Sequence, residues 1–483
     1  MKKSVFKNAI FKFLLNIFNL VVPIIVGPYV LRKLGPDLMG VINYSQAIFA
    51  YFFIFASFGV YQYGLREISK ARNDKNKLKS VFTSLFFITV ISNIVITLIY
   101  YIYIRITVTT TSMYIVSIIL TFNFISNIFY TEWVNEALES YDFITIKTII
   151  IRIIYVVVLL LIVKSSKDYG IYVLLTVLST FFNNIVSYFY VKRYIKFDFK
   201  NIKIKKHIKP MLLVVILSNA NVLYTQLDKV MLGEYVSKSS VAFYTMAQNI
   251  SYMINAVLLS LIHVSIPRLS HYIGNGQKNK YISLLNKISR MYLFLLFPAS
   301  IGMIILSKEI VLIYGGEQYA SAYQLLMLFS VYIITIAYDT IFSNQIMYIN
   351  GFEKEQVRIV FFGGFINLIL NILILNLGIF NENYSVITTI FANIICVISQ
   401  YIFIKKRIKL DYNIFSFDKS KYLILSLIFI PVTLLIKMLN YNMFIYIILV
   451  IVVNATIYFS ILYFTKDDIF LEGLNKLLKK KFK

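Results

Sequence analysis

The chain has 483 residues, of which 59% are hydrophobic and 14% are charged, and its mean hydropathy is +0.75. This composition excludes a soluble globular domain and is typical of a protein whose solvent is lipid. The net charge of +26 does not indicate nucleic-acid binding, because the basic residues lie in short connections between apolar segments. The single cysteine, Cys396, excludes an intrachain disulfide framework and a thiolate metal cluster.

Apolar stretches of about twenty residues divide the chain into about fourteen predicted membrane-spanning helices. The first six span 9–31, 40–63, 80–103, 113–133, 144–163 and 171–191. The next six span 210–232, 241–264, 288–306, 322–348, 358–380 and 384–404, and the last two span 422–439 and 443–464. We therefore predict an all-α polytopic membrane protein. The first span is too long for the core of a cleavable signal peptide and should remain as an anchor.

Lysine and arginine are concentrated in every second connection, at 2–7, 66–79, 192–209, 268–290, 354–358, 405–421 and 466–483. The positive-inside rule makes these connections cytoplasmic. Both termini are then cytoplasmic, and the number of spans is even. In the tail at 467–483, apolar residues recur at helical spacing opposite a lysine-rich face, which predicts a helix lying on the inner leaflet.

A short internal repeat supports a division into two halves. Leu34-Gly35, Val41-x-x-Tyr44 and Gln46 recur as Leu232-Gly233, Val241-x-x-Tyr244 and Gln248, in the same connection of each half. With the equal number of spans, this pattern predicts two parallel six-helix lobes. The predicted domains are an N-terminal lobe at 1–208, a C-terminal lobe at 209–404, and a third region at 405–483 with two extra spans and the basic amphipathic tail.

The sequence contains no pattern typical of catalysis or of cofactor binding. No glycine-rich loop ends in Gly-Lys-Ser or Gly-Lys-Thr, so nucleotide hydrolysis by that route is excluded. The three histidines, His207, His263 and His271, lack metal-ligand spacing. No nucleophile, base and orienting residue can be grouped. We predict that the protein is not an enzyme and has neither a catalytic residue, a metal site nor a cofactor.

Ionisable residues at membrane depth are costly and often mark a transport pathway. Arg152 lies near the middle of its span and is a candidate cavity cation for an anionic substrate, the alternative being a structural pairing with another helix. Lys147 and Lys437 lie nearer to span ends and are predicted to reach the interface with their long side chains.

Acidic residues in the spans are candidates for coupling to an ion. Asp228 and the adjacent Lys229 point about a hundred degrees apart on a helix, so they are not a simple mutual pair. Asp339 lies inside the tenth span, and Glu132 closes the fourth. These three carboxylates, Asp228, Asp339 and Glu132, can take up a proton, or they can anchor helix ends.

Several stretches of the sequence resemble the bacterial oligosaccharide flippases of the Wzx type. The first-half motifs are Pro28-Tyr-Val-Leu-Arg32-Lys-Leu-Gly35-Pro36, then Gly40-Val-Ile-Asn-Tyr44-Ser-Gln-Ala47, then Phe58-Gly-Val-x-x-Tyr-Gly64-Leu-Arg66-Glu67-Ile68. The second-half motifs are Leu227-Asp228-Lys-Val-Met231-Leu232-Gly233, Ala242-Phe-Tyr244 and Ile266-Pro267-Arg268-Leu269-Ser270. The sequence departs from the family's usual pattern at two places. Asp37-Leu-Met precedes Gly40, and Leu65 stands before Arg66 where the family commonly has threonine.

This resemblance implies the fold of the multidrug/oligosaccharidyl-lipid/polysaccharide exporter superfamily, with two six-helix lobes in a bacterial cytoplasmic membrane. It implies a flippase that moves undecaprenyl-diphosphate-linked oligosaccharides outward for capsule, O-antigen or related polysaccharide. The candidate ligands of the diphosphate are Arg152, Arg66, Arg32 and Lys229. Membrane lipids are expected partners, and a polysaccharide polymerase and a chain-length regulator are candidate partners.

Two other functions compete with this interpretation. A drug or cation antiporter of the same superfamily would prefer an anionic cavity, which a deep Arg152 disfavours. A membrane polysaccharide polymerase or ligase would need a large outer loop with paired basic residues, and the predicted outer connections are short.

Overall fold

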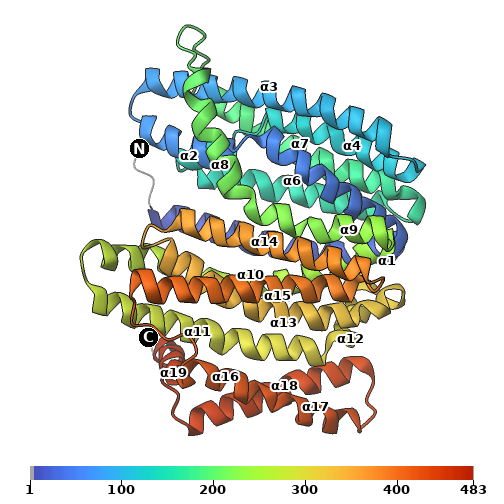
Figure 1. The fold of residues 1–483 in the computed structure, drawn as a ribbon, viewed down its shortest axis with the longest axis vertical. Coiled ribbons are helices and arrows are strands. Elements are labelled where there is room, and N and C mark those ends of the chain that lie inside the picture. The colour runs from blue at the N-terminus through green and yellow to red at the C-terminus, as the bar shows by residue number, and fades with distance from the viewer. Residues whose placement is uncertain (1–4, 482–483) are drawn as a thin grey trace. The chain divides into compact units, whose positions relative to one another are not determined.

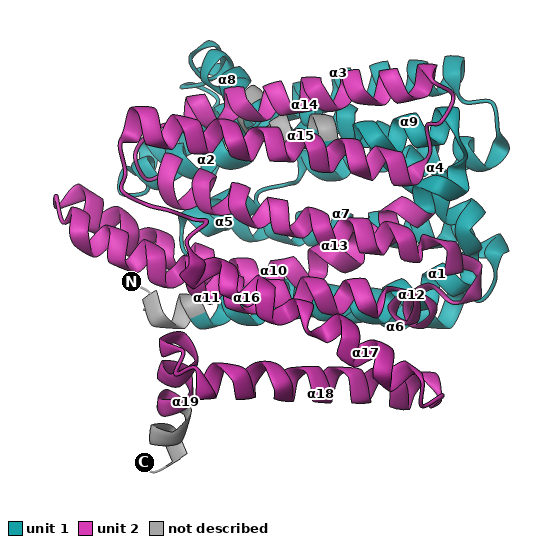
Figure 2. Cartoon of the chain, turned by 60° about the horizontal axis from the view of Figure 1, so that its bottom comes forward, with its two compact units in different colours: residues 1–242 teal, residues 243–483 magenta. Residues whose placement is uncertain are grey.

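The computed structural model describes residues 5–481, with the side chains of 5–9, 216–221, 223–224 and 477–481 left undescribed. The described residues form helices and turns and contain no strand. They divide into two compact units, Met1–Ala242 and Phe243–Lys483 (Figure 2). In each unit the long helices run roughly along one common direction (Figure 1). The all-α prediction is confirmed, and the division into lobes at 208 and 404 stays a prediction.

Unit 1 contains nine helices and one short 3-10 turn. They are α1 Val5–Ser57, α2 Val60–Ala71, α3 Lys75–Thr107, α4 Thr111–Ile128, α5 Glu132–Ala137, α6 Tyr141–Ile162, η1 Ser166–Asp168, α7 Tyr169–Lys192, α8 Ile204–Thr225 and α9 Leu227–Tyr235. Helix α1 packs against α3, α4 and α6, and α7 packs against α4 and α6.

Unit 2 begins within α10 Lys238–Gly274. It continues with α11 Lys278–Ile305, α12 Ser307–Gly315, η2 Glu317–Ala322, α13 Tyr323–Thr340, η3 Ile341–Met347, α14 Glu353–Asn376 and α15 Glu382–Phe403. The last elements are η4 Ile404–Ile408, α16 Phe417–Leu427, α17 Phe429–Lys437, α18 Met443–Phe464 and α19 Asp468–Lys481. Helix α13 packs against α11 and α15, and α14 packs against α15.

Twelve helical stretches of the described residues are long and apolar enough to cross a membrane. The protein is a multi-pass integral membrane protein. The first of these stretches, Ile10–Ala71, contains both of the first two predicted spans, and α8, which contains the start of the predicted span 210–232, is not among the twelve. The count of fourteen and the cytoplasmic location of the termini therefore stay predictions.

The predicted break between the first two spans is a kink inside α1. Gly35 has φ 74° and ψ 169°, outside the helical region, and Pro36 follows it. A φ of this sign is strained for a residue with a side chain, and proline lacks the N–H that would continue the helix. The Leu-Gly-Pro sequence therefore separates two helical segments of α1 and redirects the chain between them.

The two repeated segments meet within unit 1. The ring of Tyr44 lies against Gly233, where a Cβ atom would fall 2.2 Å from the ring. The ammonium of Lys238 lies 3.3 Å from the centre of the same ring. Gly40 is equally confined, because a Cβ atom there would fall 1.9 Å from the carbonyl oxygen of Lys238. The repeat thus supplies glycines that let α1 approach α9 and the start of α10.

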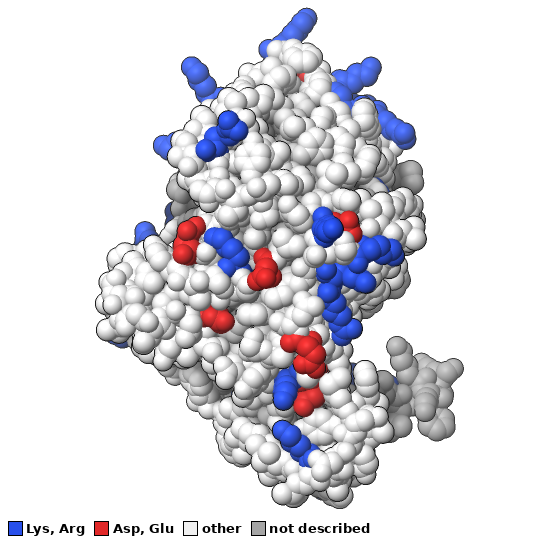
Figure 3. All heavy atoms as spheres, turned by 90° about the vertical axis from the view of Figure 1, so that its right-hand side faces the viewer, with Lys and Arg blue, Asp and Glu red and all other residues white. Residues whose placement is uncertain are grey.

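Large apolar side chains remain exposed along the helices, as expected for a surface in contact with lipid. Figure 3 looks onto one set of ends of the long helices, where charged side chains of both signs are scattered among uncharged ones. The apolar surface places this chain among proteins solvated by lipid and not by water.

Candidate functional site

Unit 1 contains a partly open cavity of about 510 Å³, lined by both polar and apolar side chains, and its size is within the usual range of ligand pockets. Four helices line it: the second half of α1, the start of α2, the end of α4, and the middle of α7. Its polar lining residues are Gln46, Ser57, Tyr61, Gln62, Asn123, Asn127, Tyr130, Thr176, Thr180 and Asn184. Among the described residues, no charged side chain lines it.

Some of the lining amides are held in place by the protein. The side-chain nitrogen of Asn127 donates to Asn93 Oδ1 at 3.2 Å, and that of Asn93 donates to the carbonyl oxygen of Ala56 at 3.1 Å. The side-chain nitrogen of Asn184 donates to Ser126 Oγ at 3.0 Å. These bonds join α1, α3, α4 and α7, so this part of the wall is preorganised.

Other lining amides are free. Within the part of the chain that the structure describes, the side chains of Gln46, Gln62 and Asn123 form no hydrogen bond. Gln46 and Asn123 are partly buried, Gln62 is exposed, and all three line the cavity. A primary amide carries both a donor and an acceptor, so these three side chains present unused hydrogen-bonding groups to whatever occupies the cavity.

Two aromatic rings stand at the α2 side of the cavity. The ring centres of Tyr61 and Tyr130 are 6.5 Å apart, and the Tyr61 hydroxyl donates to Glu136 at 3.1 Å. Trp133, the only tryptophan of the chain, donates from Nε1 to the Tyr130 carbonyl oxygen at 3.0 Å. Helix α5 therefore contacts both residues: Glu136 accepts from the Tyr61 hydroxyl, and the Trp133 indole donates to the backbone of Tyr130.

Local sequence explains how α2 reaches the cavity. Phe58 and Gly59 both have positive φ, 47° and 66°, so the chain turns sharply between α1 and α2. Gly64 then lets α2 lie on α5, because a Cβ atom there would fall 2.5 Å from the Trp133 ring. The Phe-Gly and Tyr-Gly motifs of the sequence thus place Tyr61 and Gln62 at the cavity.

Unit 2 contains a second cavity, of about 320 Å³, with far fewer polar groups. Helices α10, α11, α17 and α18 line it almost entirely with apolar side chains, among them Phe294, Leu295, Met303, Ile451 and Phe459. Asn454, the one amide of its described lining, donates to Thr433 Oγ1 at 3.0 Å. This cavity suits a hydrocarbon.

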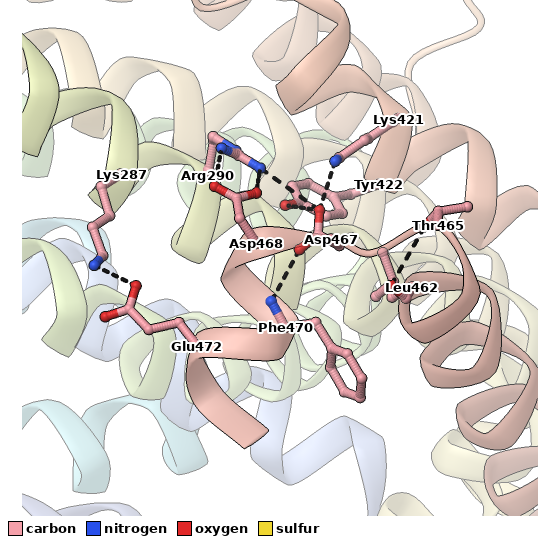
Figure 4. Close-up of polar contacts among 10 residues, drawn as sticks. All are labelled: Lys287, Arg290, Lys421, Tyr422, Leu462, Thr465, Asp467, Asp468, Phe470 and Glu472. Carbon is pink, nitrogen blue, oxygen red and sulfur yellow. Dashed lines mark hydrogen bonds and ion pairs between the residues drawn. The ribbon is translucent and has the colours of Figure 1, made fainter. Parts of the chain in front are cut away.

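A third, strongly polar cavity of about 500 Å³ lies in unit 2 between α11, α16 and α19. Figure 4 shows that its cations face acidic groups at the start of α19. Arg290 bonds Asp468, Lys287 bonds Glu472, and Lys421 lies 2.6 Å from Asp467. The ion pair with Arg290 lowers the pKa of Asp468, and that with Lys287 lowers the pKa of Glu472. This site holds α19 and is already neutralised.

The structure corrects the prediction for Lys147. It does not reach the interface, because it is only 6% exposed. Its ammonium lies 3.0 Å from Glu132 Oε2 and 2.5 Å from Ser187 Oγ. Lys147 and Glu132 therefore form a buried ion pair between α5 and α6, and α7 contributes the hydroxyl. Lys437, by contrast, is exposed at the end of α17, as predicted.

The four predicted phosphate ligands, Arg152, Arg66, Arg32 and Lys229, all lie in unit 1, but none of them lines its cavity. Arg152 is partly buried in α6 and, among the described residues, forms no hydrogen bond or ion pair. Tyr155, one turn further along α6, lies 3.3 Å from the hydroxyl of Thr176, a lining residue.

The surroundings of the other three phosphate candidates differ. Arg66 is exposed on α2, lies 3.3 Å from Glu67, and stacks on the ring of Tyr63. Arg32 is exposed three residues before the kink of α1. Lys229 is partly buried in α9.

The predicted ion-coupling carboxylates are in different surroundings. Asp228 is 1% exposed in α9. Asp339 lies in α13 and accepts a hydrogen bond from Gln400, whose side chain also donates to Gln356 at 3.1 Å. Glu132 is held by Lys147. Asp228 and Glu132 lie in unit 1, and Asp339 lies in unit 2.

The free amides Gln62 and Asn123 were not singled out from the sequence, and Gln46 was noted only as part of the repeat. The available signal was the presence of amides in otherwise apolar spans. That signal is ambiguous, because Asn93 and Asn127 have the same character and bond each other.

The chain was compared with known families and proteins. The profile of a family described as "Polysaccharide biosynthesis protein" matches residues 5–273. A "Putative O-antigen transporter" of Escherichia coli (strain K12) is 24% identical over 375 residues, which cover 76% of this chain and 89% of that protein. A protein of the same name from Shigella dysenteriae is 24% identical over 371 residues, which cover 75% of this chain and 91% of that protein.

Two solved structures share the fold. The inward closed conformation of the lipid II flippase MurJ superposes with a TM-score of 0.71 at 18% identity, covering 96% of this chain and all of that one. An inward-facing multidrug resistance MATE family transporter of the MOP superfamily gives a TM-score of 0.60 at 13% identity. The match covers 82% of this chain and 94% of that chain. At these identities the likeness concerns the fold.

Proposed function

Because this chain belongs to the polysaccharide biosynthesis protein family, we propose that it is a flippase for lipid-linked oligosaccharides in the bacterial inner membrane. The observation that carries this proposal is the presence, in one membrane-embedded chain, of a cavity with many polar side chains and a second cavity that is almost entirely apolar. A lipid-linked oligosaccharide has a hydroxyl-rich head and a long hydrocarbon tail. The unit 1 cavity offers hydrogen-bonding groups of the kind that such a head needs, and the unit 2 cavity offers an apolar surface suited to hydrocarbon.

The diphosphate of an undecaprenyl-diphosphate carrier needs a cation. Arg152 is the best candidate, because its guanidinium is partly buried in a span and unbonded among the described residues. A planar guanidinium can hold a phosphate with two parallel hydrogen bonds. Arg66, Arg32 and Lys229 are further candidates, which a headgroup would meet at other points of its path.

The membrane potential supports outward movement of this substrate. An interior-negative potential favours outward transfer by about 2.3 kcal/mol per charge per 100 mV, or about 4 to 5 kcal/mol for two charges. Coupling to a proton through Asp228 or Asp339 is an additional route. Glu132 is less suited, because protonation would break its ion pair with Lys147.

Two other functions fit less well. A drug or cation antiporter shares the fold, but the described lining of the polar cavity contains no carboxylate to hold a cation. A polymerase or ligase would convert its substrate, and the relatives named above are transporters. A polymerase and a chain-length regulator are better placed as partners that use the flipped product.

The experiment that tests the proposal is a flipping assay with the purified full chain in liposomes. The substrate is the lipid-linked oligosaccharide extracted from cells in which the gene for this chain is deleted. Periodate added outside oxidises only the sugars of the outer leaflet, so a working flippase raises the oxidised fraction from about half towards completion. An oxidised fraction equal to that of protein-free liposomes would contradict the proposal.

Arg152 is tested in the same assay. Arg152→Ala should remove most of the flipping. Arg152→Lys should keep part of it, because lysine retains the positive charge but lacks the planar guanidinium that can form two parallel hydrogen bonds. Since Arg152 is unbonded within the described part of the chain, neither variant should change the thermal unfolding of the purified protein by more than about 0.5 kcal/mol. Parallel loss of folding and flipping would instead indicate a structural pairing.

A further inference from the structure

The lining of the unit 1 cavity separates amides that hold the wall from amides that face the space. Asn127 and Asn184 are bonded to neighbouring helices, whereas Gln46, Gln62 and Asn123 have no partner among the described residues. The free amides come from α1, α2 and α4 and face one cavity. Groups that need hydrogen bonds and lie inside a membrane-embedded unit indicate a polar occupant.

We propose that this cavity binds the sugar part of the substrate, and that Gln46, Gln62 and Asn123 determine which sugar is accepted. The inference rests on the proposed flippase function and deepens it by naming the site and the chemical class. The occupant is a neutral, hydroxyl-rich sugar unit. Carrier lipid and diphosphate are bound elsewhere in the chain.

The chemistry of the free side chains matches sugar hydroxyls. A hydroxyl donates one hydrogen bond and accepts others, and each amide offers a carbonyl oxygen and an NH₂ group on one rigid plane. Two neighbouring hydroxyls of a sugar ring can therefore bond one amide at both ends. Three amides on three helices can distinguish sugars by the positions of these hydroxyls, because a hydroxyl that leaves water and finds no partner in the cavity loses hydrogen bonds.

Aromatic rings supply the second half of a sugar site. Tyr61 and Tyr130 present ring faces at the α2 side, and Phe49 and Phe53, with ring centres 5.4 Å apart, line the α1 side. The face of an aromatic ring is electron-rich and attracts the polarised C–H groups of a sugar. Glu136 holds the Tyr61 hydroxyl and so acts as a positioning residue for that ring.

The absence of charge in the described lining sets the class of sugar. An anionic sugar would lose its hydration on entering and would find no cation among these side chains to offset that loss. A neutral sugar loses only hydrogen bonds to water, and the free amides replace them. The cavity therefore favours uncharged sugars over acidic ones.

The test measures binding of two lipids to the purified full chain by native mass spectrometry. One probe is the lipid-linked oligosaccharide from cells lacking the gene, and the other is undecaprenyl diphosphate without sugar. The test variant is Gln46→Leu with Asn123→Leu, which removes the amides at similar side-chain volume. The control is Gln324→Leu, which removes an amide of α13 that bonds Asn383 and does not line the cavity.

The wild-type chain should prefer the sugar-bearing lipid. The double variant should lose about tenfold or more in affinity for that lipid and keep its affinity for undecaprenyl diphosphate, as expected for two or more lost hydrogen bonds. The control should change neither affinity. Should the double variant fail to fold, Asn123→Asp keeps the side-chain shape, removes the NH₂ donor and should lower the same affinity alone.

Three outcomes would count against the inference. A double variant that keeps the wild-type preference, or one that binds both lipids more weakly to the same degree, would remove the cavity from sugar recognition. A wild-type chain that binds the two lipids equally well but flips the sugar-bearing one would also overturn the sugar site while leaving the flippase function intact. Absence of flipping by the wild type would refute the proposed function itself.

Discussion

Unit 1 and unit 2 both contain asparagines inside membrane-spanning helices, but they use them differently. In unit 2, Asn367 and Asn371 face Thr388 and Thr389 across α14 and α15, and the side chains bond one another. In unit 1, Asn123 faces a cavity and bonds no described residue. An amide between two packed helices stabilises their contact, whereas an amide on a cavity wall is available to a ligand. The position of the side chain, and not its type, decides its role.

The largest expected effect concerns a bonded polar group of unit 1. Lys147→Met should lower the free energy of unfolding by about 3 kcal/mol or more, because Glu132 is left as a buried charge without its cation. Thermal unfolding of the purified protein in detergent measures this loss. The second change Glu132→Gln should restore much of the stability by removing the stranded charge.

A matched control for this pair exists on the surface of the same unit. Arg72 and Glu139 lie 2.9 Å apart with side chains 47% and 42% exposed, against 4% and 16% for Lys147 and Glu132. Arg72→Met should therefore cost less than about 1 kcal/mol. Equal losses for Lys147→Met and Arg72→Met would show that burial does not set the strength of the inner pair.

The next effect tests the comparison of the two units with one asparagine-to-leucine substitution in each unit. Asn367→Leu should lower the free energy of unfolding by about 1 to 3 kcal/mol, because Thr389 and Asn371 lose a bonded partner inside the bundle. Asn123→Leu removes no bond and should leave the unfolding of the protein unchanged within about 0.5 kcal/mol. A loss of stability for Asn123→Leu as large as that for Asn367→Leu would place Asn123 among the structural amides.

The apolar, helical character of the chain could be predicted from the sequence for a physical reason. In lipid every backbone polar group must be satisfied within the helix, so a spanning segment is long, apolar and helical. The predicted span 443–464 coincides with α18, Met443–Phe464. The tail helix also forms at 468–481, close to its predicted position.

The polar contacts could not be predicted in the same way. The pair of Lys147 and Glu132 depends on the break between α4 and α5, which turns Glu132 towards α6. The free state of Asn123 depends on which helices surround the cavity. The hydropathy of the sequence predicts neither the Lys147–Glu132 pair nor the free state of Asn123. Both features depend on how the helices pack and not on their composition.

A third prediction compares the two cavities. A Cβ atom at Gly302 would meet nothing within 4 Å, and Gly302 lines the apolar cavity of unit 2. Gly302→Leu should raise the stability of α11 by about 1 kcal/mol, because leucine favours a helix over glycine. Gly302→Leu should also reduce flipping in liposomes, because the leucine side chain would fill part of the apolar cavity that we expect to hold the hydrocarbon tail of the substrate. Gly302→Ala is the control, with a similar gain in helix stability and little loss of flipping. Undiminished flipping by Gly302→Leu would remove the apolar cavity from the transport path.

The smallest effect is expected at α19, where ion pairs are largely exposed to water. Asp468→Asn with Glu472→Gln should cost no more than about 1 kcal/mol, because exposed pairs are weak. The readout is limited proteolysis, which should cut the tail faster once the ion pairs of Asp468 with Arg290 and of Glu472 with Lys287 are gone, while Asp467 keeps its contacts with Arg290 and Lys421. Flipping should not change, because neither acidic residue lines the unit 1 or the unit 2 cavity described above.

The same contacts fix the pH dependence of α19. The partners Arg290 and Lys287 lower the pKa values of Asp468 and Glu472, so the folded protein binds these protons more weakly than the unfolded chain does. The stabilisation is then fully present above the ordinary carboxyl pKa of about 4, and it is lost as the pH falls below that value. Tail cleavage by an acid-tolerant protease should stay constant from about pH 8 to pH 5 and rise only in stronger acid. A rise already between pH 7 and pH 6 would mean that some other group, and not these two carboxylates, holds the helix in place.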